Sequence, residues 1–294
     1  MEKIDHTKLK VTSKIELSGV RTRMELNESK EDIKNKMKQI RKDLGDWQDK
    51  LYAHGKYSVL ICLQGMDTAG KDSLIREVFK DFNSRGVVVH SFKTPSSREL
   101  KHDYLWRHYV LLPERGKFGV FNRTHYENVL VTRVHPEYLL NENLPGIKSI
   151  EDVNTRFWEQ RFDSIKKFEE HLANNGTIIF KFFLHLSKEE QRQRLLRRLN
   201  KPNKNWKFSP GDLEERKLWN TYQECYQDAI NNTSTKKAPW YIIPSDDKDT
   251  ARLLVAKILY EELIQYKDVK EPELDPDIKK NLADYREQLS REKN

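Results

Sequence analysis

The stretch that decides the fold is residues 58–73, which read SVLICLQGMDTAGKDS. It begins with an apolar run typical of a buried strand, continues with a glycine loop and leads into a segment with helical character. Gly65 and Gly70 bracket four residues before Lys71, which is the spacing of a phosphate-binding loop (P-loop). Backbone N–H groups can then line an anion site, to which the following helix adds the positive end of its dipole. This order of elements predicts phosphoryl transfer.

The loop contains two carboxylates, Asp67 inside it and Asp72 at the position where Ser or Thr usually binds magnesium. Anions in a poorly solvated site repel one another unless a cation lies between them. We therefore predict that Asp67 is a catalytic magnesium ligand and that Lys71 reaches the transferred phosphate. The remaining loop residues are predicted to bind phosphate: Gly65, Met66, Thr68, Ala69, Gly70, Asp72 and Ser73. The alternative is a glycine turn with solvated Asp side chains, which the flanking strand and helix disfavour.

Composition favours a polyanionic partner. The 294 residues carry a net charge of +8 and a pI near 9.2, although 46 side chains are acidic.

No internal repeat or composition break divides the chain, so we predict one domain over residues 1–294. Cys62 and Cys225 lack metal-binding spacing. The start lacks an apolar signal region, and no run approaches the roughly 18 apolar residues of a membrane span, so we expect a cytoplasmic protein without a membrane partner.

Four further apolar segments predict strands, and the stretches between them are long enough for crossover helices. These strands are Gly86–Phe92, Lys117–Asn122, Thr177–Leu186 and Trp240–Pro244. The alternation predicts an α/β fold with a five-stranded, mainly parallel sheet and helices on both faces. Ligands gather at the carboxyl ends of the strands in such sheets.

The two ends of the chain are predicted to add to this domain. Within residues 1–55, apolar residues from Ile33 to Leu51 recur at alternating spacings of four and three, which predicts an amphipathic helix. We expect that helix to pack on its own domain, with a subunit contact as the alternative. The charged tail over residues 267–294 contains two prolines and is predicted to be a loose segment with a short surface helix.

The end of the strand before Arg123 is the second predicted part of the site. Asn122 stands where many P-loop enzymes have an Asp that orients magnesium. A neutral amide adds no charge, so Asp67 and Glu127 would supply the anionic metal ligands. We predict that Arg123 is catalytic and stabilises the transferring phosphoryl group. The alternative is a plain helical ion pair between Arg123 and Glu127.

A nucleotide site is predicted around the segment that follows the second strand. Lys93 and Arg107 could hold phosphate, and Trp106 could stack on a base or fill the core. The predicted nucleotide-binding residues are Lys93, Asp103, Arg107, Asn122, Arg133 and Asp212.

A basic helical segment at about residues 188–220 is predicted to be a lid. At about 100° per residue, Arg194, Arg197 and Arg198 share one helical face, and Leu195, Leu196 and Leu199 share the other. The segment therefore predicts a cationic stripe, with a solvated basic face as the alternative.

Together these motifs resemble the polyphosphate kinase 2 family. The matching stretches are GMDTAGKD at 65–72, HDYLWR at 102–107, FNRTHYENVLV at 121–131, WKF at 206–208 with Asp212 and Trp219, and TSTKKAPWY at 233–241. The resemblance runs from about Lys14 to Tyr266. It implies a thymidylate-kinase-like P-loop kinase fold with a helical lid, and transfer of a phosphoryl group from inorganic polyphosphate to AMP, ADP or other nucleotides. It also implies Mg²⁺ as cofactor, with Mn²⁺ as a substitute.

Position by position, Asp67 and Lys71 match the loop carboxylate and lysine of that family, and Asn122 and Arg123 match its strand-end motif. Arg194, Arg198, Lys207 and Asp212 match its lid residues, and the first three are predicted to bind polyphosphate. The resemblance also implies a homo-oligomer, a dimer or a tetramer. An ATP-dependent nucleotide or small-molecule kinase is the first alternative. A nucleic-acid-binding P-loop protein is the second, and nucleic acid is a disfavoured partner.

Overall fold

The structure, a computed structural model, describes residues 5–292. A five-stranded sheet lies at its centre in the order β2-β3-β1-β4-β5, and every pairing is parallel. The predicted parallel sheet is confirmed, and each strand limit lies within about one residue of its prediction. The strands are β1 (Ser58–Gln64), β2 (Val87–Ser91), β3 (Phe118–Asn122), β4 (Thr177–His185) and β5 (Trp240–Pro244).

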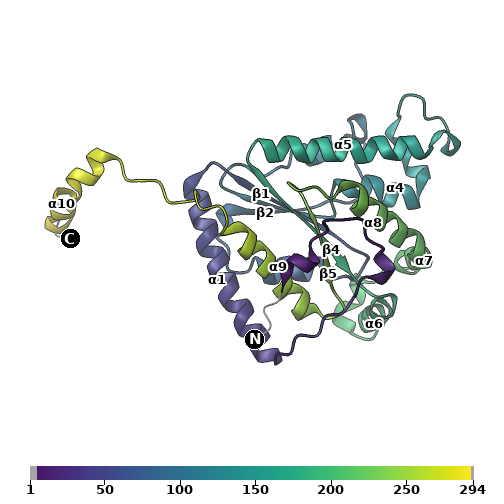
Figure 1. Cartoon of the computed structure of the whole chain (residues 1–294), viewed down its shortest axis with the longest axis horizontal. Coiled ribbons are helices and arrows are strands. Elements are labelled where there is room, and N and C mark those ends of the chain that lie inside the picture. The colour runs from purple at the N-terminus through teal and green to yellow at the C-terminus, as the bar shows by residue number, and fades with distance from the viewer. Residues whose placement is uncertain (1–4, 293–294) are drawn as a thin grey trace.

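Helices cover both faces of the sheet (Figure 1). One face packs against α1 (Lys30–His54), α2 (Lys71–Val78) and α9 (Lys248–Leu263), and the other against α5 (Thr155–Asn174) and α8 (Trp219–Thr233). The remaining α-helices of the described chain are α3 (Trp106–Tyr109), α4 (Val131–Val134), α6 (Lys188–Leu199), α7 (Gly211–Lys217) and α10 (Pro276–Arg291).

The central strand β1 shows why this sequence forms a buried parallel strand. All of its residues are buried, because helices cover the sheet on both sides. Its side chains alternate between the two faces: Val59, Ile61 and Leu63 join the core under α1 and α9, whereas Leu60 and Cys62 join the core on the opposite side. The P-loop thus begins at the end of the central, fully buried strand.

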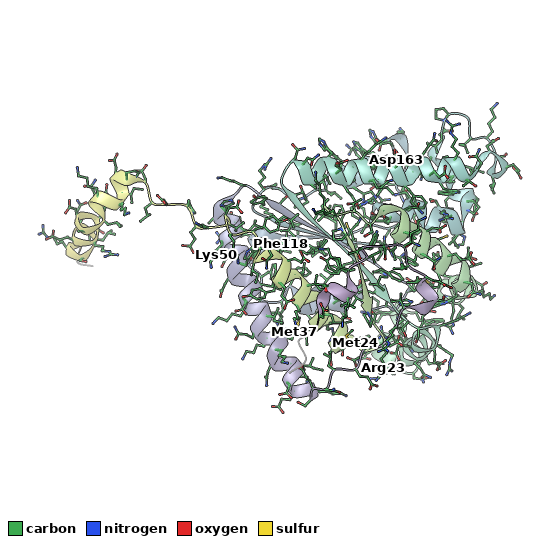
Figure 2. The ribbon with its side chains drawn as sticks, in the orientation of Figure 1. Arg23, Met24, Met37, Lys50, Phe118 and Asp163 are labelled. Atoms are coloured by element: carbon green, nitrogen blue, oxygen red, sulfur yellow. The ribbon has the colours of Figure 1, made fainter. Side chains whose placement is uncertain are left out.

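The predicted amphipathic helix is α1, and the structure places its apolar seam against its own domain. It begins at the Ser29 cap, where Ser29 and Asp32 form a capping box, and ends at Gly55 with φ 66. Its buried residues pack on α9 and the sheet. In Figure 2, Met37 and Phe118 lie inside the molecule, whereas Lys50 lies at the outer edge of α1.

The C-terminal helix α10 lies away from the body of the molecule, at the end of an extended segment (Figure 1). None of its residues is buried. Within the predicted tail, the structure thus has a helix on the surface. Among residues 5–292, the structure has no helix that combines the length and the apolar character needed to cross a bilayer.

A fully buried ion pair lies between β4 and α5. The Lys181 amine donates to Glu169 Oε2 at 2.6 Å, to the Thr233 carbonyl at 2.8 Å and to the Tyr126 hydroxyl at 2.9 Å. Glu169 also accepts a hydrogen bond from the Tyr126 hydroxyl and lies 3.2 Å from His125 Nε2. Both charges are removed from water, so each depends on the other.

We predict that Lys181→Met will lower the free energy of unfolding by about 3–5 kcal/mol, because it leaves the Glu169 carboxylate buried without its cation. The double variant Lys181→Met with Glu169→Gln removes both charges and should recover more than about 1 kcal/mol of that loss. Urea unfolding of both variants measures the difference. A double variant no more stable than the single one would contradict this account.

Candidate active site

The P-loop joins β1 to α2 at the carboxyl edge of the sheet. Gly65 has φ +153 and Gly70 has φ +110, values that L side chains rarely adopt. A Cβ atom on Gly65 would lie only 2.9 Å from the Leu184 carbonyl oxygen, so β4 packs directly against the loop. Thr68 also has a positive φ, of 67. The loop therefore keeps its shape through tight backbone packing.

Lys71, the first residue of α2, folds back over this loop. Its amine donates to the carbonyl of Gly65 at 2.5 Å and to that of Met66 at 3.3 Å. Burial lowers the pKa of Lys71 to about 8, and the positive charge of Arg123 acts in the same direction. A phosphate group next to the amine would raise that pKa again, because an anion favours the charged form.

Arg123 lies between two carboxylates. Its Nη2 is 2.7 Å from Asp67 Oδ1, and its Nη1 is 3.4 Å from Glu127 Oε2. The negative charge of Glu127 is the main cause of the raised pKa of Arg123, and Asp67 adds to it. The alternative of an ion pair with Glu127 is present in the structure, but the same guanidinium also bridges to the P-loop. The backbone of Arg123 has φ 58, in the left-handed region.

Asn122 connects the end of β3 to the start of α2. Its Nδ2 donates to Asp72 Oδ1 at 2.8 Å and to Ser91 Oγ at 3.2 Å. An Asp at position 122 would place two carboxylates within hydrogen-bonding distance, where they repel each other. The two departures from the usual P-loop pattern, Asp72 and Asn122, therefore compensate each other. Asn122 Oδ1 is buried and has no hydrogen-bond partner in the structure.

The structure corrects the prediction of a cationic stripe on α6. The Arg194 side chain is only 3% exposed, whereas that of Arg197 is 54% exposed. Arg194 donates to the carbonyls of two P-loop residues and to two carbonyls after β5, namely Thr68, Ala69, Ser245 and Asp246. Of the three predicted apolar leucines only Leu195 is buried, whereas Leu196 and Leu199 are exposed.

Beyond α6, the predicted lid consists of the 3₁₀ helix η8 (Pro202–Lys207) and α7. Arg198 Nη1 lies 3.1 Å from Asp212 Oδ2 and 3.1 Å from the Lys207 carbonyl oxygen. Burial raises the pKa of Asp212, and the negative charge of Asp67 contributes to the shift. The Lys207 amine lies over the ring of the exposed Trp206.

The predicted nucleotide-binding residues do not all come together. Lys93 is exposed, and Asp103 accepts a hydrogen bond from the Leu105 backbone N–H. Arg107 pairs with Glu99 at 3.2 Å. Burial lowers the pKa of Arg107, whereas the negative charges of Glu99 and Glu127 oppose that shift. Arg107 therefore interacts electrostatically with Glu127 of the site.

Arg133 and Trp106 differ most from what we expected. Arg133 pairs with Asp228 of α8 at 2.8 Å. Within residues 5–292, no hydrogen bond or ion pair of Arg133 reaches the P-loop. Trp106 is half-buried and stacks on His102 with ring centres 3.9 Å apart. It therefore does not fill the core.

Sequence reasoning missed two sets of residues that shape the site. Gln191 of α6 donates to the Asp67 carbonyl at 3.1 Å, and no motif around it indicated this contact. The buried Lys181–Glu169 pair lies under the 3₁₀ helix η5 (His125–Val129), which contains Glu127 and begins two residues after Arg123. A lysine inside the apolar strand sequence FKF was the available signal for that pair.

We predict that Gly65→Ala will destabilise the protein by about 1–3 kcal/mol, because the added methyl meets the Leu184 carbonyl and the backbone is left-handed. Gly19→Ala is the matched control, since a Cβ atom there meets nothing within 4 Å and φ is unrestricted. Thermal unfolding of both variants measures the difference. Equal melting temperatures for the two variants would contradict the tight packing of the loop.

Comparisons with known proteins agree with this geometry. The family Polyphosphate kinase 2 matches residues 27–272. The chain is 47% identical over 262 residues to the ADP-polyphosphate phosphotransferase of Rhodopseudomonas palustris, with 89% of each chain covered. It is 49% identical over 216 residues to the AMP/ADP-polyphosphate phosphotransferase of Meiothermus ruber, which covers 74% of this chain and 75% of that protein.

A solved structure agrees as well. The crystal structure of Polyphosphate Kinase 2 from Arthrobacter aurescens TC1 matches with a TM-score of 0.86 and 35% identity, and covers 95% of both chains. The fold and the resemblance predicted from the motifs are thereby confirmed. The chain belongs to the polyphosphate kinase 2 family.

Proposed function

We propose that this chain transfers a phosphoryl group from inorganic polyphosphate to a nucleoside monophosphate or diphosphate. The observation that carries the proposal is the group around Arg123, which joins a P-loop carboxylate to a strand-end carboxylate beside the buried Lys71. The relatives from R. palustris and M. ruber, whose names specify ADP and AMP/ADP, support AMP and ADP as acceptors.

The chemistry proposed is direct in-line transfer, in which the protein positions the phosphates and balances their charge. Backbone N–H groups of the P-loop hold the phosphate chain, and the helix dipole of α2 favours its negative charge. Lys71 and Arg123 stabilise the charge that develops on the transferring group. For this, Arg123 exchanges part of its contact with Asp67 and Glu127 for the phosphoryl oxygens.

Divalent metal binding fits the oxygen donors at this edge. Asp67, Glu127 and the unpartnered Asn122 Oδ1 are hard ligands of the kind that Mg²⁺ prefers, with Mn²⁺ as a substitute. No group of three or more His, Cys, Asp or Glu residues among those described could hold a metal alone. This fits a Mg²⁺ bound through one or two carboxylates together with substrate phosphates. Bound there, Mg²⁺ would neutralise phosphate charge.

The acceptor is proposed to bind on the side of Asn122 and Arg107, with Lys93 and Asp103 at its outer edge. Arg107 is held by Glu99 and lies over the Phe92 ring, so its guanidinium is already oriented. Arg133 is assigned no direct contact, because its partner is Asp228.

The segment from α6 to α7 is proposed to close over the phosphates and exclude water that would hydrolyse the donor. Arg198 contacts Asp212 and the Lys207 carbonyl, and Arg198 and Lys207 are proposed to bind the donor, whereas Arg194 is proposed to hold the loop rather than the substrate. A cytoplasmic location and assembly as a dimer or tetramer stay predictions.

The proposal is tested by incubating the protein with magnesium and either AMP or ADP, with long-chain polyphosphate or ATP as the only donor. We expect ADP to form from AMP, or ATP from ADP, with polyphosphate. Asp67→Asn should lower kcat by at least about 100-fold, because it removes a charge at the reacting phosphates. Turnover only with ATP would favour an ATP-dependent kinase instead.

The pKa of Lys71 predicts a pH dependence. Burial lowers it to about 8, so the amine is protonated below that pH and loses its charge above it. Because kcat/KM reports the free enzyme, kcat/KM for polyphosphate should fall about tenfold per pH unit above pH 8. Lys248→Gln is the control: it removes a different amine whose pKa is also about 8, and its kcat/KM should still fall above that pH. A profile that stays flat to high pH would exclude Lys71 as the titrating group.

A further inference from the structure

Several cations meet beside the P-loop, at the first turn of α9. Lys248, the first residue of α9, is half-buried. Burial lowers its pKa to about 8, and the charged neighbours with the largest effects are all positive: Arg194, Arg197, Arg252 and Lys204. They come from α6, α9 and the lid helix η8, so three separate elements bring positive charge to one place.

This cluster adjoins the loop itself. A Cβ atom added to Gly70 would lie 4.0 Å from Lys248 Cε and 3.8 Å from Arg194 Nη1. Gly70 is the residue directly before Lys71, at the N-terminus of α2. A phosphate chain that leaves the P-loop across Gly70 would therefore meet Lys248 next.

The cations of the cluster differ in whether a carboxylate pairs with them. Arg194 and Arg197 both pair with Glu190, at 2.8 Å and 3.2 Å, and Arg252 pairs with Asp249 at 2.7 Å. Within the part of the chain that the structure describes, no ion pair joins Lys248 or Lys204 to a carboxylate. Positive charges gathered without counter-charges repel one another, and an anion placed between them removes that cost.

We propose that Lys248 and Lys204, with Arg197, form a subsite for the next phosphates of the polyphosphate donor, beyond those held by the P-loop. This inference rests on the proposed function. A polyphosphate chain repeats its charge along its length, so a row of cations suits it. The base and ribose of ATP are uncharged and would gain little there, which favours polyphosphate over ATP as donor.

The position of Lys204 adds a role for the lid. Lys204 belongs to η8 and Lys248 to α9, so a chain bound between them bridges the lid to the body of the domain. The same chain relieves the repulsion between the two amines. Donor binding therefore favours the arrangement in which η8 lies close to α9.

The test compares Lys248→Gln and Lys204→Gln with Lys34→Gln, a matched control on the exposed side of α1. The KM for long-chain polyphosphate should rise about tenfold in each of the first two variants, as expected for a lost charge-assisted contact. The KM for AMP or ADP should change less than about twofold, because the acceptor binds elsewhere. Lys34→Gln should match the wild type. Lys204 is exposed, so its variant tests the subsite even if Lys248→Gln folds poorly.

Equilibrium binding gives a second readout that does not need turnover. The logarithm of the polyphosphate affinity should fall with the logarithm of salt concentration, and each variant should reduce that slope by about one. An unchanged KM and slope in both variants would overturn the subsite. A raised KM for AMP or ADP with an unchanged KM for polyphosphate would assign the cluster to the acceptor and overturn it too. If the wild type does not use polyphosphate as a donor, the proposed function is overturned instead. Salt-dependent binding of polyphosphate to the wild type would then show whether the subsite itself exists.

Discussion

The guanidinium of Arg194 connects the parts of the site that come from distant points of the chain. It donates to carbonyls of the P-loop and to carbonyls that follow β5, and its Nε lies 2.8 Å from Glu190. Buried carbonyls need hydrogen-bond donors, and Arg194 supplies them here. A planar fork with several donors can satisfy two loops at once, which a lysine amine cannot do with the same geometry. The shape of the P-loop thus depends on where α6 lies.

The charges at the strand ends are arranged around that fixed loop. Asn122 holds Asp72 without adding a charge, whereas Arg123 holds Asp67 and Glu127 by adding one. The carboxylates are therefore kept in place before any substrate arrives. Beneath them, the buried Lys181 holds the carboxylate that η5 packs against. Substrate binding can exchange these internal partners for phosphate and metal with little rearrangement of the backbone.

Much of the fold followed from local pattern. The apolar run of β1 and the glycine spacing after it predict a strand, a P-loop and a helix, because each depends on neighbouring residues only. The burial of Arg194 could not be predicted, since helical periodicity shows which residues share a face but not what covers it. The Lys181–Glu169 pair required the packing of α5 on β4. The pairing of Arg133 with Asp228 likewise depends on how α4 meets α8.

The C-terminal helix has a practical consequence. The family match ends at residue 272, before α10 begins at Pro276, and the helix lies clear of the body (Figure 1). The strand ends that form the site lie near α6, on the far side of the sheet from α10 in that view. A bead, an electrode surface or a fused enzyme joined to α10 would therefore leave the path to the phosphates open, and α10 would serve as a built-in spacer for immobilisation.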